Sequence, residues 1–151
     1  MAIDLPNRGI SVAIPLSSIG GRRTLEAFAN GHQDDENENE VKDMTECETE
    51  LIVVICAKGY TDQVMDAARG AGAGGGTVVH AKGTGSQYTD KFFGLSIADE
   101  KEMIYIVSTK EKKKEIMKAI MEKAGTSTDA HGVAFSLPVS DTAGLRIFDK
   151  D

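Results

Sequence analysis

The order of apolar and polar residues predicts strands and helices from residue 51 onward. Residues 51–56 are consecutive apolar residues, which indicates a central strand buried on both faces. Thr61 then occupies the position expected of a helix N-cap, and apolar residues recur at helical spacing after it. This pattern predicts a short helix that closes at Gly70 or Gly72.

The rest of the chain continues this alternation of strand and helix. Thr77 to Ala81 begins with β-branched residues and predicts a strand. Ser108 and Glu111 have the spacing of a capping box, and the apolar stripe after them predicts a helix that ends at Gly125. The other predicted segments are a strand at 92–97, a turn at 98–101, a buried strand at 103–107 and a last strand at 133–137.

These segments predict an α+β fold of the ferredoxin-like kind. The order β-α-β-β-α-β, read from residue 51 onward, is typical of one antiparallel sheet with two helices on a single face. The strands are apolar on both sides, so the face without helices also needs a cover. We expect a second subunit to supply it, which predicts an oligomer.

Composition divides the chain into three parts. Residues 34–40 are a block of Asp, Glu and Asn that buries nothing, so residues 21–50 are interpreted as an acidic linker before a domain at 51–151. Residues 9–17 and 132–140 share a pattern of glycine, apolar run, proline, apolar residue and serine. Either residues 1–20 are a strand-like segment resembling the last strand of a preceding repeat, or the likeness is due to chance.

Charge and hydropathy limit the classes of partner. The formal net charge is -7 and the pI about 5.0, which argues against nucleic acid and against anionic membranes. No run approaches the ~18 apolar residues of a membrane span, and the first residues lack a signal-peptide pattern, so a cytoplasmic protein is expected. Cys47 and Cys56 have no metal-ligand spacing and are expected to be unpaired thiols.

Catalytic motifs give little support to an enzyme. Glycines 70, 72 and 75 satisfy a dinucleotide-binding pattern, but they follow a helix and precede a strand, the reverse of what that motif requires. Neither a P-loop nor a GxSxG motif occurs, and His80 and His131 have no evident carboxylate partner. His80, on a strand, is interpreted as a core or interface histidine, and no catalytic or metal-binding residue is predicted.

Residues 82–87 are the best candidate for a binding site. Small residues leave successive backbone N–H groups open to an anion, and Lys82 adds a positive charge. Arg146 could reach a phosphate if the tail folds back. The alternative interpretation is a plain hairpin loop without a ligand. The residues of this candidate loop are Lys82, Gly83, Thr84, Gly85, Ser86 and Gln87.

Four motifs, in the same order along the chain, resemble the P-II family of nitrogen regulatory signal-transduction proteins at its divergent end. They are residues 55–64, 75–78, 82–87 and 132–139, and the resemblance extends from residue 51 to residue 146. The resemblance implies a homotrimer of ferredoxin-like subunits that binds a small effector in clefts between subunits. A loop after the second strand, the T-loop, here 84–101, would contact a target protein, so the implied role is regulation rather than catalysis.

The resemblance also assigns roles to single residues. It implies an adenine nucleotide such as ATP or ADP, with Mg²⁺, as effector, sometimes with 2-oxoglutarate, and it implies no obligatory cofactor. The residues that match the family's binding positions are Thr77 facing the adenine, Gly83, Gly85 and Gln87 at the base of the T-loop, Gly132 in the turn before the last strand, and Arg146 on phosphate.

Three positions depart from the family pattern. Ser86 and Gly144 stand where arginines are usual, and Val133 replaces a lysine. Each lost charge-assisted contact weakens polyphosphate binding by roughly 1.5–3 kcal/mol, so a less charged ligand is an alternative to ATP. A further alternative is a structural or metal-handling trimer of the CutA kind on the same fold, with His80 or His131 binding the metal.

Overall fold

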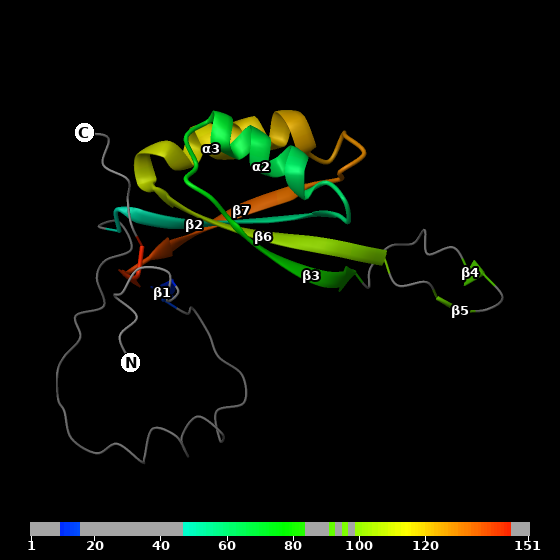
Figure 1. Ribbon diagram of the computed structural model, residues 1–151, viewed down its shortest axis with the longest axis horizontal. Coiled ribbons are helices and arrows are strands. Elements are labelled where there is room, and N and C mark those ends of the chain that lie inside the picture. The colour runs from blue at the N-terminus through cyan, green and yellow to red at the C-terminus, as the bar shows by residue number, and fades with distance from the viewer. Residues whose placement is uncertain (1–9, 16–46, 84–90, 93–94, 97–98, 146–151) are drawn as a thin grey trace, which may run out of the picture.

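The computed structural model describes residues 10–15, 47–83, 91–92, 95–96 and 99–145 (Figure 1). Four antiparallel strands form the main sheet in the order β3-β6-β2-β7. Their bounds are β2 Thr49–Ala57, β3 Thr77–Gly83, β6 Asp99–Thr109 and β7 Val133–Val139. Helices α2 (Thr61–Gly70) and α3 (Lys110–Ala124) lie together on one face of the sheet, which confirms the predicted ferredoxin-like α+β fold (Figure 1). Within these ranges, no helix combines the length and apolar character that a membrane span requires.

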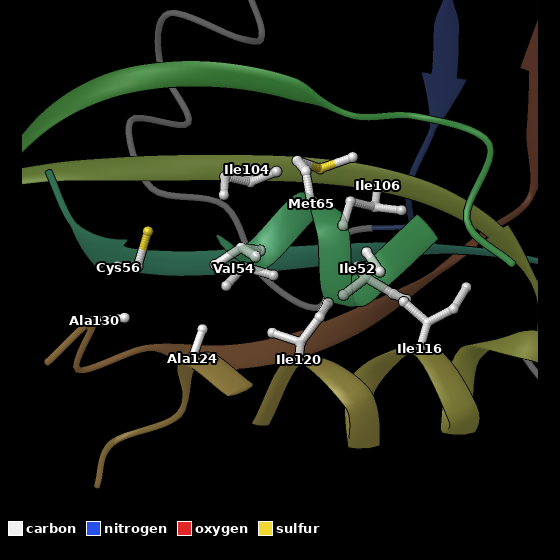
Figure 2. Close-up of a cluster of buried hydrophobic side chains, with 12 residues drawn as sticks. Ile52, Val54, Cys56, Met65, Ile104, Ile106, Ile116, Ile120, Ala124 and Ala130 are labelled. Carbon is white, nitrogen blue, oxygen red and sulfur yellow. The ribbon is translucent and has the colours of Figure 1, made fainter. Parts of the chain in front are cut away.

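The helix-covered face of the sheet contains the main core. Successive side chains of a strand point to opposite faces, so alternate residues of β2 and β6 face the helices. Burying one such isoleucine contributes roughly 1.5–3 kcal/mol to folding. The fully buried members from the two strands are Ile52, Val54, Cys56, Ile104 and Ile106, and they pack on Val64, Met65, Ala68, Ile116, Ile120 and Ala124 (Figure 2).

The start of β6 differs from the prediction. Residues 98–101 were predicted as a turn because they are polar, but Asp99 to Lys101 belong to β6 and pair with the end of β3. The side chains of Lys101 and Asp99 form an ion pair at 2.8 Å along this strand. The single strand predicted at 92–97 is also wrong, because β4 (Lys91–Phe92) and β5 (Leu95–Ser96) form a two-stranded hairpin there.

Both helix starts are displaced by one residue from the prediction. Thr61 is the first residue of α2 rather than its N-cap, which is Tyr60, and the Thr61 hydroxyl donates to Glu102 instead. Thr109 caps α3 in place of Ser108, and its side-chain oxygen accepts the Lys112 N–H at 3.4 Å. The predicted helix ends hold: α3 is followed by Gly125, and Gly72, after α2, has a φ of +94° that suits glycine.

Within the described ranges, the second face of the sheet is covered at one end only. Strand β1 (Ser11–Ala13) pairs with β8 (Asp141–Ala143), and it lies on the side of the sheet away from the helices (Figure 1). Val12 and Ile14 pack there against Leu51, Val53 and Val139. The proposed division of the chain at residues 20 and 50 stays a prediction, because residues 16–46 lie outside the described ranges.

At its other end, no described helix or strand covers the second face. Two rows of side chains cross the sheet there, according to the register of its strands. Val79, Val133 and Phe135 are 45%, 50% and 42% exposed, which is unusual for large apolar side chains. This end of the face therefore exposes the apolar side chains that a second subunit was expected to cover. The rows are Val79, Met103, Ile55 and Val133, and beside them Thr77, Tyr105, Val53 and Phe135.

Candidate functional site

The structure describes four of the nine predicted binding residues. Thr77, Lys82 and Gly83 lie on β3, and Gly132 immediately precedes β7. The remaining predicted residues lie outside the described ranges, and their roles stay predictions. They are Thr84, Gly85, Ser86, Gln87 and Arg146. The predicted loop 84–101 is shorter than expected, because β6 already begins at Asp99.

Strand β3 is an edge strand that carries three predicted residues along its length. It pairs with β6 alone among the described strands, with Thr77 opposite Tyr105 and Gly83 opposite Asp99. Thr77 and Lys82 are exposed. At a rise of about 3.3 Å per residue, Thr77 and Gly83 are about 20 Å apart, at opposite ends of the strand. A ligand that contacts both must extend along the edge or involve residues from another element.

Gly132 lies in the turn between α3 and β7, where there is no room for a side chain. A Cβ at this position would overlap the Ala124 carbonyl oxygen. The Gly132 N–H donates to that same oxygen at 2.9 Å, and the His131 N–H donates to the Thr128 oxygen at 3.0 Å. The close passage of this turn over the end of α3 explains the glycine without a ligand.

The described residues of the predicted binding site come from opposite edges of the sheet. β3 and β7 are the two outer strands in the order β3-β6-β2-β7. Three steps of about 4.8 Å separate them, so Gly132 is at least about 14 Å from Gly83 and from Thr77 within one copy of the chain. One copy therefore does not bring the predicted residues together.

A buried carboxylate lies beside β3, and sequence reasoning missed it. The Glu102 side chain is 8% exposed and accepts hydrogen bonds from the Thr61 hydroxyl and from the Gly59 N–H at 3.2 Å. The hydrogen bond from Thr61 holds the pKa of Glu102 below its ordinary value, although burial alone would raise it. The signal was available, because Glu102 is an even-numbered residue of β6, like Ile104 on the face toward the helices.

An ion pair and a backbone hydrogen bond also hold the first residues of β6. Lys58 Nζ lies 2.6 Å from Glu100 Oε2, and this hydrogen bond raises the pKa of Lys58 and lowers that of Glu100. The Lys58 N–H also donates to the Glu100 carbonyl oxygen at 3.2 Å. Together with Glu102, these contacts attach the first residues of β6 to the segment between β2 and α2. The chain after residue 98 therefore re-enters the sheet at a fixed point.

His80 is not the core histidine of one interpretation. Its side chain is 79% exposed, with Nδ1 3.6 Å from Glu102 Oε1. His131 is also exposed and has a φ of 45°. Over the described ranges, no group of three His, Cys, Asp or Glu side chains is placed to hold a metal ion. Cys47 and Cys56 are buried free thiols, and burial raises the pKa of Cys56.

A shallow depression of about 210 Å³ lies at the other end of the sheet from Gly83. It is formed where β2 begins and where β7 passes into β8. Glu48 and Asp141 give its lining acidic groups and no basic one, which does not suit a phosphate. The lining residues are Cys47, Glu48, Thr49, Val139, Ser140, Asp141 and Thr142.

Comparisons with known proteins agree with the fold. A family model described as nitrogen regulatory protein P-II matches residues 49–148. Among solved structures, Arabidopsis thaliana PII bound to citrate is 25% identical with a TM-score of 0.50, and the match covers 64% of this chain and 80% of that one. A Bacillus cereus protein related to NIF3 is 15% identical with a TM-score of 0.51, covering 64% of this chain and 26% of that one, and is similar in fold alone. No curated protein sequence matches the chain.

Proposed function

Because this chain belongs to the nitrogen regulatory protein P-II family, we propose that it binds a small effector between copies of itself and reports it to a partner protein. The family consists of signal-transduction regulators rather than enzymes. We assign the chain to nitrogen or related metabolic regulation.

The distribution of the binding residues over two edges is the observation that carries this proposal. Thr77 and Gly83 lie on one outer strand and Gly132 precedes the other. A second copy that places its β7 edge near β3 would bring the two sets together. The open apolar end of the second face, with Phe135 42% exposed, supports such an assembly. A closed ring of copies satisfies both conditions, because each copy then uses each edge once, and the ring we propose has three copies.

The effector we propose is an adenine nucleotide with few phosphates. Lys82 and Gly83 stand at the start of the loop 84–98, where backbone N–H groups and one lysine can hold an anion. Arg146 would add a second charge. Ser86, Val133 and Gly144 supply no charge at the positions where relatives carry cations, which favours ADP or AMP over ATP. No permanently bound cofactor is part of the proposal, and Mg²⁺ would enter with the nucleotide.

We propose that the loop between β3 and β6 transmits the effect of ligand binding to the partner protein. Its return point is held by the Lys58 to Glu100 contact and by the buried Glu102. A ligand at Gly83 therefore acts on one end of a loop whose other end is fixed. The conformations available to the loop change as a result, and a partner protein that reads the loop responds.

Sedimentation and titration calorimetry test this proposal together. We expect a mass of three copies, and heat on titration with ADP, AMP, ATP, cyclic dinucleotides or 2-oxoglutarate, with the strongest binding for ADP or AMP. Lys82→Ala should weaken nucleotide binding by about 10-fold or more, the value of one charge-assisted contact.

Lys118→Ala is the matched control for that titration. Lys118 is 75% exposed on α3 and lies 3.8 Å from Glu122, away from β3. Its loss should leave binding unchanged. An assembled protein that gives no heat with any of these compounds would contradict the effector we propose, and a single-copy mass at all concentrations would contradict the site between copies.

A further inference from the structure

Strand β8 pairs, among the described residues, with one strand only, and that strand is β1 from the other end of the chain. Ser11 lies opposite Ala143, and Val12 lies opposite Thr142. The Ala13 carbonyl accepts a hydrogen bond from the Ser140 N–H at 3.0 Å and from its hydroxyl at 3.2 Å. Ala13 therefore directs its backbone toward β8, and Val12, one residue earlier, directs its backbone away.

The place that β1 occupies has an apolar floor. Val12 and Ile14 lie against Leu51, Val53 and Val139 on the second face. We call the β8 edge and these three floor residues the β8 docking site. It accepts a strand with free backbone groups on one edge and two apolar side chains, two residues apart, on one face.

The sequence of β7 repeats the features by which β1 fills this site. Residues 9–17 read GISVAIPLS and residues 132–140 read GVAFSLPVS. In this alignment Phe135 stands at the position of Val12, and Leu137 at the position of Ile14. Phe135 is 42% exposed in the single chain, whereas a large aromatic side chain is normally covered.

The backbone of β7 points in the direction that the site requires. The Ala57 N–H donates to the Ala130 oxygen at 2.9 Å, so odd-numbered residues of β2 face the β7 side. Val53 is one of these and lies opposite Phe135, which therefore faces β2. Ala134 and Ser136, on either side of Phe135, direct their N–H and C=O groups to the outer edge of β7.

The β7 residues whose backbone groups point outward therefore align with the β1 residues whose backbone groups point toward β8. Ala134 and Ser136 occupy the positions of Ser11 and Ala13 in the repeated pattern. The Pro138 backbone also faces the outer edge of β7. Proline is tolerated in a strand where its missing N–H would face no neighbour. β1 likewise stops before Pro15. Pairing along either segment would end at the same place.

We propose that the β8 docking site receives the β7 edge of a second copy of this chain, and that β1 fills the site when no second copy is bound. Phe135 of the incoming copy takes the place of Val12 and is thereby covered. β1 is then an internal competitor that sets the concentration at which copies assemble. This inference rests on the self-association in the proposed function and adds its contact and its regulator.

Cysteine trapping tests the contact. The pair Val12 and Thr142 is a non-hydrogen-bonded pair, whose Cα atoms in such sheets are about 4.5 Å apart, a distance that a disulfide can span. A chain with Phe135→Cys and Thr142→Cys should therefore form disulfide-linked multimers under an added oxidant. Cys47 and Cys56 are buried, so they supply little background.

The control moves one cysteine by a single residue. In a chain with Phe135→Cys and Asp141→Cys, the second thiol lies on the opposite face of β8 from residue 142. Its cross-linking should therefore be at least about 10-fold slower. Equal trapping of the two pairs, or trapping of neither in a protein that sediments as an assembly, overturns the contact. Trapping of neither in a protein that sediments as a single copy overturns both the contact and the assembly in the proposed function.

A proline in β1 tests the competition. Ala13→Pro removes an N–H that faces β8 and should release β1, so that the apparent dissociation constant of the assembly falls by about 10-fold or more. Ala13→Ser keeps the N–H and should leave that constant unchanged. An assembly that is unaffected or weakened by Ala13→Pro, with unfolding of the main sheet unchanged, overturns the role of β1.

Discussion

The two faces of the central sheet differ in how they are completed. On one face, Ile52 and Ile104 are fully buried under α2 and α3, so a single copy of the chain covers it. On the other face, β1 covers the end near Leu51, while Phe135 and Val133 stay exposed. The first face holds the fold together, and the second is available for contacts with other molecules. Stability and assembly can therefore be changed separately.

The largest effect on folding should come from the helix-covered face. Ile52→Ala removes a fully buried side chain and leaves a cavity, so the free energy of unfolding should fall by about 2–5 kcal/mol. Urea denaturation followed by circular dichroism measures this change. Val79→Ala, at a side chain 45% exposed on the second face, is the control and should cost far less. Equal losses would show that the two faces contribute alike to folding.

A smaller effect is expected at the polar rim of the same face. Thr61→Val removes the hydroxyl that donates to Glu102 and should cost about 1–3 kcal/mol at neutral pH, whereas Thr61→Ser keeps the donor. The pKa of Glu102 lies below its ordinary value of 4.5 in the folded chain, so its stabilising contribution is present above that value and is lost as the pH falls through the folded pKa.

The pH dependence separates this contact from simple packing. The unfolding free energies of Thr61→Val and the unchanged chain should converge as denaturation is measured from pH 7 down to pH 3. A difference that stays constant over that range would mean that the hydroxyl does not act through the Glu102 carboxylate.

The smallest effect on folding should come from the open end of the second face. Phe135→Ser should lower the free energy of unfolding of the single chain by only about 1–2 kcal/mol, because the side chain is already 42% exposed. The same substitution should shift the sedimentation profile from an assembly toward single copies. A large loss of stability in dilute protein would instead place Phe135 in the core of the fold.

The main strands and helices could be predicted from the sequence because their burial is strongly periodic. Residues 51–56 lie between two other strands and between two apolar layers, so the apolar run and the central strand β2 coincide. The ends of the strands and helices were less predictable. Asp99 and Lys101 are polar residues that suit a turn, yet both pair with β3, and Lys101 also pairs with β2, which keeps them in a strand. Pairing partners distant in sequence, rather than local propensity, determine that these residues form a strand.

The candidate site was predictable only in part for the same reason. Lys82 and Gly83 were predicted as loop residues after a strand ending at Ala81, but they are the last two residues of the edge strand β3, where they pair with Glu100 and Asp99. Glu102 was missed because its partners Thr61 and Gly59 come from a segment that the fold brings near. Thr61 also has the sequence signature of a cap, but its hydroxyl is used by this carboxylate.

Pro138 on the outer edge of β7 also bears on the risk of polymerisation. A contact in which one surface of each copy meets a different surface of the next adds copies in one direction, and it yields an endless filament unless the arrangement closes into a ring. A strand edge without interruption would favour such growth, in the manner of amyloid. The missing amide at Pro138 shortens the stretch on which a foreign strand can extend the sheet. A proline at this position thus limits the growth of an insoluble fibre through this edge.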